Sequence, residues 1–216
     1  MFTLARNTAI VSSPANRLAL ELWLLILEQP SLDYFDLKAM GRVCKGLREL
    51  QQKSTFDLRL FRSPPPSNGL KKGSRVQYHP LHDQADLGAS QGKWTAVRVK
   101  DETAEYGERE VPLEDLFSAT EFATAPACRN LSIDFGVVVA DPNGVKVLDF
   151  VKACVEFWSS PAPPEDAEEI AEMYGNLDVA KVTMAHTLID RVWTVFARAT
   201  VISKDWVQLG PSNYDS

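Results

Sequence analysis

Residues 18–27 read LALELWLLIL, and nine of these ten positions are apolar. A helix of this composition has no polar face, so in a globular domain it must be buried on every side. The chain that follows is polar and marked by glycine and proline, which predicts only a small module around the helix. We therefore expect another protein to cover it. The run is far shorter than the ~20 residues that cross a bilayer, and Arg17 and Glu28 flank it, which argues against a membrane span.

A second apolar stretch follows a helix-stop signal at residues 29–33, where QPSLD combines a proline with N-cap chemistry. Apolar side chains then recur at spacings of three or four, which predicts one or two amphipathic helices with possible breaks at Gly41 and Gly46. The apolar positions are Leu37, Met40, Val43, Leu47 and Leu50. A basic row follows the same spacing on a different face and consists of Lys38, Arg42, Lys45 and Arg48.

These two stretches together carry a family resemblance. Residues 18–50, LALELWLLILEQPSLDYFDLKAMGRVCKGLREL, resemble an F-box, and the order and spacing agree with the family pattern without a gap. The matching residues are Leu18, Glu21-Leu22, Ile26-Leu27, Asp36-Leu37, Val43-Cys44-Lys45, Arg48 and Leu50. The sequence departs from the pattern at Ala19 and Pro30, where the family usually has Pro and Leu, and at Leu47, where an aromatic is common.

The resemblance implies a three-helix module that docks on the Skp-family adaptor of an SCF-type cullin-RING ubiquitin ligase. It implies adaptor contacts by Leu18, Leu22, Leu25, Ile26, Val43, Cys44, Leu47 and Leu50. By analogy, the part after the box should bind an unknown protein substrate. The chain is then expected to be a non-catalytic subunit without a catalytic residue, cofactor or metal. The alternative is an intracellular enzyme or structural protein whose N-terminal helices pack on its own core.

A triple proline divides the chain, because residues 63–69, SPPPSNG, cannot continue a helix or a central strand. We expect an F-box and following segment at 14–62, a proline-rich connector at 63–74 and a C-terminal domain at 75–216. The stretches DLRLFRSPPP (57–66) and YHPL (78–81) are similar to the region after the box in many fungal F-box proteins.

The C-terminal part is predicted to be α+β, with an antiparallel or mixed sheet. Alternating or β-branched residues indicate strands within 93–99, 130–140, 192–202 and 206–209. Residues 141–144, DPNG, are typical of a turn. Helical spacing indicates helices at 147–158 and 164–174, the second ending at Gly175. Residues 126–158 resemble a C-terminal domain of uncharacterised basidiomycete proteins, which implies a fold and no activity.

Charge and cysteine content indicate the class of partner and the compartment. Residues 17–62 carry eight basic and six acidic residues, which leaves −8 for the rest of a chain whose net charge is −6. The acidic remainder argues against nucleic acid as a ligand, whereas the weakly basic module suits an acidic partner, which the adaptor family is. Cys44, Cys128 and Cys154 show no CxxC pairing, which predicts reduced, packed thiols. With no apolar leader in residues 1–17, we expect a cytoplasmic or nuclear protein that binds no membrane.

Catalytic and metal-binding patterns are weak. His79 and His82 have ligand-like spacing, but no Cys or further His follows, so we interpret them as ordinary loop histidines beside Pro80. The acidic residues Glu165, Asp166, Glu168 and Glu169 begin a predicted helix, where they favour its dipole. Cys154 and His186 are residue types that could form a nucleophile and its base. Cys154, however, occupies an apolar position of a predicted helix, which favours a thiol packed in the core.

Overall fold

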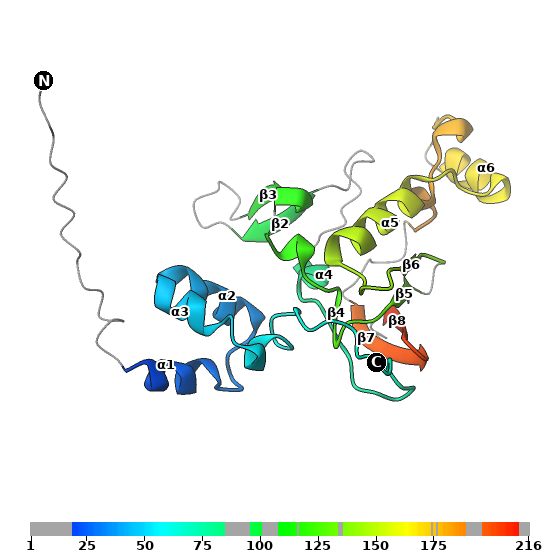
Figure 1. Cartoon of the computed structure of the whole chain (residues 1–216). Coiled ribbons are helices and arrows are strands. Elements are labelled where there is room, and N and C mark those ends of the chain that lie inside the picture. Colours follow the sequence, from blue (N-terminus) through cyan, green and yellow to red (C-terminus); the bar gives the residue numbers. More distant parts are fainter. Residues whose placement is uncertain are drawn as a thin grey trace, which may run out of the picture. The chain divides into compact units, whose positions relative to one another are not determined.

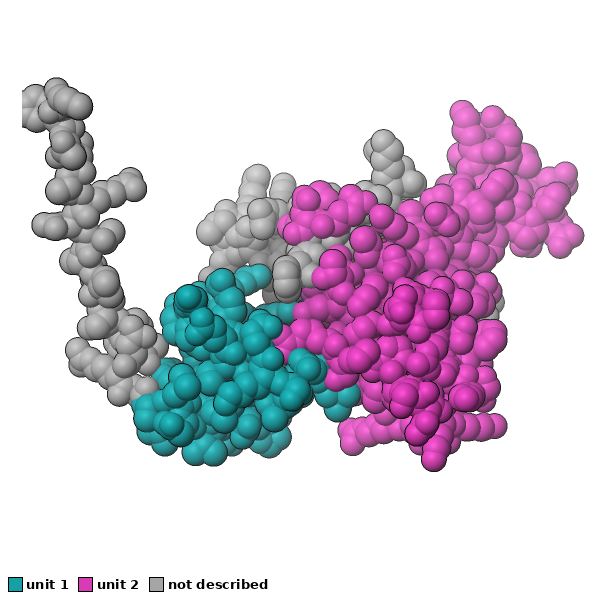
Figure 2. Space-filling view, in the orientation of Figure 1, with its two compact units in different colours: residues 1–60 teal, residues 61–216 magenta. Residues whose placement is uncertain are grey.

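The computed structural model describes residues 19–84, 96–100, 108–115, 117–133, 136–173, 175, 177–188 and 196–211. The fold is α+β, as predicted, with helices near the N-terminus and strands mainly in the C-terminal part (Figure 1). The chain divides into two compact units, residues 1–60 and residues 61–216 (Figure 2). Over the described ranges, no helix is both long enough and apolar enough to span a membrane.

In residues 19–60, the described part of the first unit, there are three α-helices: α1 (Leu20–Leu27), α2 (Tyr34–Val43) and α3 (Lys45–Leu50). A 3-10 helix, η2 (Ser54–Phe56), follows them. A capping box starts α2, since the Asp33 carboxylate accepts from the Asp36 N–H at 2.8 Å and the Asp36 carboxylate accepts from the Asp33 N–H at 3.0 Å. The buried apolar side chains of the unit are Leu27, Tyr34, Leu37, Leu47, Leu50, Phe56 and Leu60.

The break between α2 and α3 lies at Cys44, whose backbone is extended, so the predicted breaks at the two glycines are wrong. Gly41 lies within α2 and Gly46 within α3. Gly41 serves close packing instead, because a Cβ there would lie 2.5 Å from the side-chain oxygen of Gln51. The Gln51 side chain, which lies against Gly41, donates a hydrogen bond from its amide to the carbonyl of Leu37. This bond joins the end of α3 to α2.

The second unit is built on a mixed sheet of four strands in the order β6-β5-β8-β7. These strands are β5 (Asn130–Ile133), β6 (Val138–Ala140), β7 (Phe196–Ser203) and β8 (Trp206–Pro211). Neighbours are antiparallel except β5 and β8, which run parallel, with Leu131 opposite Val207. The region 130–140, predicted to contain a strand, forms a hairpin of two antiparallel strands, β5 and β6. Gly136, at φ +100°, lies between them.

Two short strand pairs accompany this sheet. β1 (Gln77–Tyr78) pairs with β4 (Thr124–Ala125), and β2 (Ala96–Lys100) pairs with β3 (Glu108–Pro112), both antiparallel. Of the predicted strands, 93–95 and 192–195 lie outside the described residues. The 3-10 helices are η3 (Leu113–Asp115), η4 (Phe117–Thr120), η5 (Val179–Lys181) and η6 (Met184–Leu188).

The α-helices of this unit are α4 (Leu81–Gln84), α5 (Val147–Ser159) and α6 (Pro164–Met173). Both longer helices confirm the sequence prediction. Gly175 follows α6 at φ +63°, and its N–H donates to the carbonyl of Glu172 at 3.1 Å, as expected of a glycine stop signal. The predicted turn at 141–144 is also present, with the Gly144 N–H donating to the carbonyl of Asp141 at 3.0 Å.

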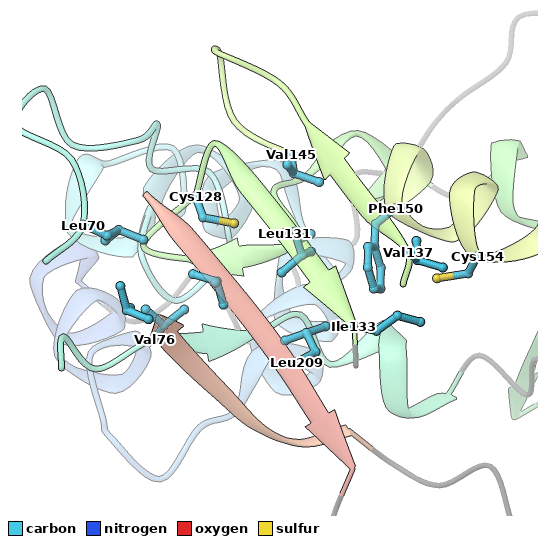
Figure 3. Close-up of a cluster of buried hydrophobic side chains, with 13 residues drawn as sticks. Leu70, Val76, Cys128, Leu131, Ile133, Val137, Val145, Phe150, Cys154 and Leu209 are labelled. Atoms are coloured by element: carbon cyan, nitrogen blue, oxygen red, sulfur yellow. The ribbon is translucent and has the colours of Figure 1, made fainter. Parts of the chain in front are cut away.

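The main core of the second unit joins α5 to the sheet (Figure 3). Phe150 and Cys154 of α5 face Ile133 and Val137 of the hairpin in this cluster. Leu70, from the stretch predicted to be a connector, also belongs to this cluster and is buried. A smaller cluster lies under α6 and consists of Ala162, Ala167, Ile170, Ala171 and Val182.

Candidate docking surface

The first helix exposes most of its apolar surface. Within α1 the buried side chain is Leu27, while the other apolar side chains are half-buried or exposed. Exposed fractions of 37 to 57% are found for Leu20, Leu22, Leu25 and Ile26, which we call the α1 surface. Isolated apolar residues on a protein surface are ordinary, but Leu22, Leu25 and Ile26 are all exposed and their spacings of three and four put them on one face of the helix, as at an interaction site.

The other residues implied as adaptor contacts are divided between the surface and the interior. Val43, at the end of α2, is 62% exposed, and Cys44 is half-buried. Leu47 and Leu50 are buried inside the unit, so they support the helices and offer little surface. Leu18 lies outside the described residues. Leu20 is a member of the α1 surface that the family pattern did not single out.

The C-terminal end of α1 is satisfied by side chains as well as by the backbone. The Gln29 amide donates to the carbonyl of Leu25 at 3.0 Å, and the Glu28 N–H donates to the carbonyl of Leu24 at 2.9 Å. The guanidinium of Arg59 donates to the carbonyls of Leu27 at 2.9 Å and Gln29 at 3.0 Å, and also to that of Leu32. Arg59 thus bonds both the last carbonyl of α1 and the loop that follows it.

The basic row beside the apolar stripe is partly engaged within the unit. The Lys45 ammonium lies 3.5 Å from the Glu49 carboxylate, and the Arg48 side chain donates to the carbonyl of Gly41 at 3.3 Å. Lys38 sits over the ring of Tyr34, 5.3 Å from its centroid. Exposed charges of this kind are screened over about 8 Å at physiological salt, so each of these interactions is weak.

Of the two histidines with ligand-like spacing, His79 lies in the loop between β1 and α4, as interpreted, whereas His82 lies within α4. His79 and His82 are buried, with Glu121 buried beside them. The Leu81 N–H donates to Nδ1 of His79, so the proton is on Nε2, 3.2 Å from the Glu121 carboxylate. Burial, and after it the nearby charge of His79, lower the pKa of His82 from 6.5 to about 3. In the part of the chain that the structure describes, no group of His, Cys, Asp or Glu is arranged to hold a metal ion.

The buried cysteines are poor nucleophiles. Burial raises the pKa of the Cys128 thiol to about 11 and that of Cys154 to about 12, so both remain protonated near neutral pH. The Nδ1 atom of His186 accepts from the Thr183 N–H at 3.0 Å, which gives that ring a local partner. The acidic side chains of α6 are exposed on a solvated face. The two buried thiols therefore have a packing role in the second unit.

No family model, no curated protein and no solved structure matches the chain. The F-box resemblance therefore depends on residues 18–50 themselves, and the physical case for docking depends on the α1 surface.

Proposed function

We propose that the chain is a substrate-receptor subunit of an SCF-type cullin-RING ubiquitin ligase, and that its first unit docks on a Skp-family adaptor through α1. The observation that carries the proposal is the exposure of Leu20, Leu22, Leu25 and Ile26 on a three-helix unit whose sequence resembles an F-box. In this proposal Val43 extends the contact, while Leu47 and Leu50 act from inside the unit by keeping its helices packed.

The energetics favour an apolar contact over a charged one. Each buried Leu or Ile contributes roughly 1.5–3 kcal/mol relative to its exposed state. Exposed ion pairs contribute about 0–1 kcal/mol each, and salt screens them. Association itself costs several kcal/mol in lost freedom, so only a contact that buries most of the α1 surface leaves a useful affinity. The basic row then assists encounter with an acidic adaptor.

The second unit is, in this proposal, the part that binds the substrate protein. It has its own core around Leu131 and Phe150, separate from the buried residues of the first unit. A receptor of this kind needs a rigid scaffold and no catalytic group of its own. The buried, protonated thiols and the pairing of His79 with Glu121 agree with a scaffold role.

The test is co-purification of the full chain with a purified Skp-family adaptor. Replacing Leu25 and Ile26 together by Lys should abolish binding, because hot-spot losses of ~2 kcal/mol or more at each position are common. Leu58→Lys is the matched control, since Leu58 is a 48% exposed leucine of the same unit outside α1. The proposal fails if the wild type does not bind, or if the folded double variant binds as well as Leu58→Lys.

A further inference from the structure

We infer that Arg59, which lies beyond the F-box-like stretch, is the positioning residue that fixes α1 for docking. The inference deepens the proposed function and rests on it. It starts from the way α1 is attached to its unit. A helix of eight residues is marginal in water by itself, and α1 exposes the apolar side chains that would normally pack it in place. Leu27 is its buried anchor.

Local capping does little for α1. Ala19 occupies the N-cap position and carries no polar side chain, and the last turn contains no basic residue to favour the helix dipole. The final carbonyls of α1 must still be satisfied. Those of Leu24, Leu25 and Ile26 accept from the residues just after the helix. The carbonyl of Leu27 accepts from Arg59, 32 residues further along the chain.

The chemistry of arginine suits this task. Its planar guanidinium presents five N–H donors in a fixed fork and remains charged at every physiological pH. In Arg59, Nη1 bonds Leu27, while Nη2 bonds Gln29 and Leu32. One side chain therefore fixes the end of α1 and the loop leading to α2, and it brings a positive charge to the negative end of the helix dipole. A lysine has a single point of donation on a flexible stem and cannot reproduce the fork.

The consequence for docking is preorganisation. With Arg59 in place, the α1 surface is held in one orientation before the adaptor arrives. Without it, α1 frays, and binding must order the helix as well as form the contact, which lowers affinity without removing any adaptor contact. Arg59 itself need not touch the adaptor.

Hydrogen exchange on the full chain, followed by mass spectrometry, tests the hold on α1 directly. In Arg59→Ala, the amides of residues 20–29 should exchange faster, whereas those of α2 and α3 should keep their protection. Arg59→Lys should give an intermediate result, and Lys53→Ala, which removes an exposed cation from the same segment, should match the wild type. Unchanged exchange in α1, or equal acceleration in all three helices, would overturn the inference.

The affinity for the adaptor provides the second readout. Arg59→Ala should weaken binding by about tenfold or more, since bonds from a charged group are among the strong ones, and Arg59→Lys should recover part of the loss. Equal affinities of the wild type and Arg59→Ala would refute the positioning role while leaving the proposed function intact. If the wild type does not bind the adaptor, the proposed function fails, and the exchange experiment alone decides whether Arg59 holds α1.

Discussion

The carboxylate of Asp205, in the turn between β7 and β8, accepts a hydrogen bond of 2.8 Å from the backbone N–H of Leu70, 135 residues earlier in the chain. The same carboxylate forms an ion pair of 2.7 Å with Arg129, whose guanidinium also donates to the carbonyl of Pro66 at 3.2 Å. Together with the burial of Leu70, these bonds hold the proline-rich stretch against the rest of the second unit, of which it is a part.

Removing this carboxylate should destabilise the second unit. Asp205→Ala leaves the N–H of Leu70 without its carboxylate acceptor and Arg129 without its counter-ion, so we expect a loss of roughly 2–3 kcal/mol in the free energy of unfolding. Lys204→Ala, at the neighbouring exposed position, is the control. Urea titration of both variants measures the effect. Equal midpoints for the two would show that the Asp205 contacts contribute nothing.

Gly144 should tolerate no side chain. It lies at φ +107°, and a Cβ there would sit 2.6 Å from the ring of Phe122 and 2.9 Å from Pro65. Gly73 also has a positive φ, +81°, but a Cβ would meet nothing within 4 Å. Gly73→Ala should therefore cost about 1–2 kcal/mol of backbone strain, and Gly144→Ala should cost a further 1–3 kcal/mol or so of overpacking. Thermal melts that show the same loss for both would contradict the packing around Gly144.

Acid should destabilise the second unit through His82. Its pKa is about 3 in the folded chain and near 6.5 in the unfolded chain, so only the unfolded chain takes up a proton as the pH falls below about 6.5. Stability is therefore complete above that pH and falls toward pH 3, by up to ~1.4 kcal/mol for each pH unit. His82→Gln should flatten this part of the profile. Parallel profiles of the variant and the wild type between about pH 7 and 4 would show that His82 is not the group responsible.

Thiol labelling should separate the three cysteines. Cys44 is half-buried at the junction of α2 and α3, whereas Cys128 and Cys154 are buried, with raised pKa values. In the folded protein at neutral pH, a thiol reagent should modify Cys44 first and the other two only as fast as the chain opens. Cys44→Ser should remove the fast phase. Fast labelling of two or three thiols in the native state would contradict the burial of the other cysteines.

Continuous helical patterns were predictable because their signals are local. α5 and α6 are marked by apolar spacing, and Pro164 and Gly175 bound the second of them. The pairs β1 with β4 and β5 with β8 were not predictable. β1 and β4 have two residues each, too few to show an alternation of apolar and polar side chains. β8 lies far along the chain from β5 and pairs with it in parallel, an arrangement that no tight turn specifies.

The surface of the first unit was predictable only in part. The composition of residues 18–27 predicted a helix that needs cover from another protein, and in this chain by itself Leu22, Leu25 and Ile26 are exposed. A spacing of three or four cannot tell which members of a stripe face the core, and here Leu47 is buried while Val43 is exposed. The role of Arg59 has no local signal either, because its bonds to the end of α1 join residues about thirty positions apart.

The most direct test of docking through α1 is site-specific photo-crosslinking to the adaptor. A photo-reactive amino acid placed at Leu25 of the full chain, 57% exposed on α1, is compared with the same group at Leu58, 48% exposed outside it. The account predicts a covalent product with a purified Skp-family adaptor from position 25 and none from position 58. Crosslinking from position 58 alone, or from neither position while the two proteins bind, would contradict it.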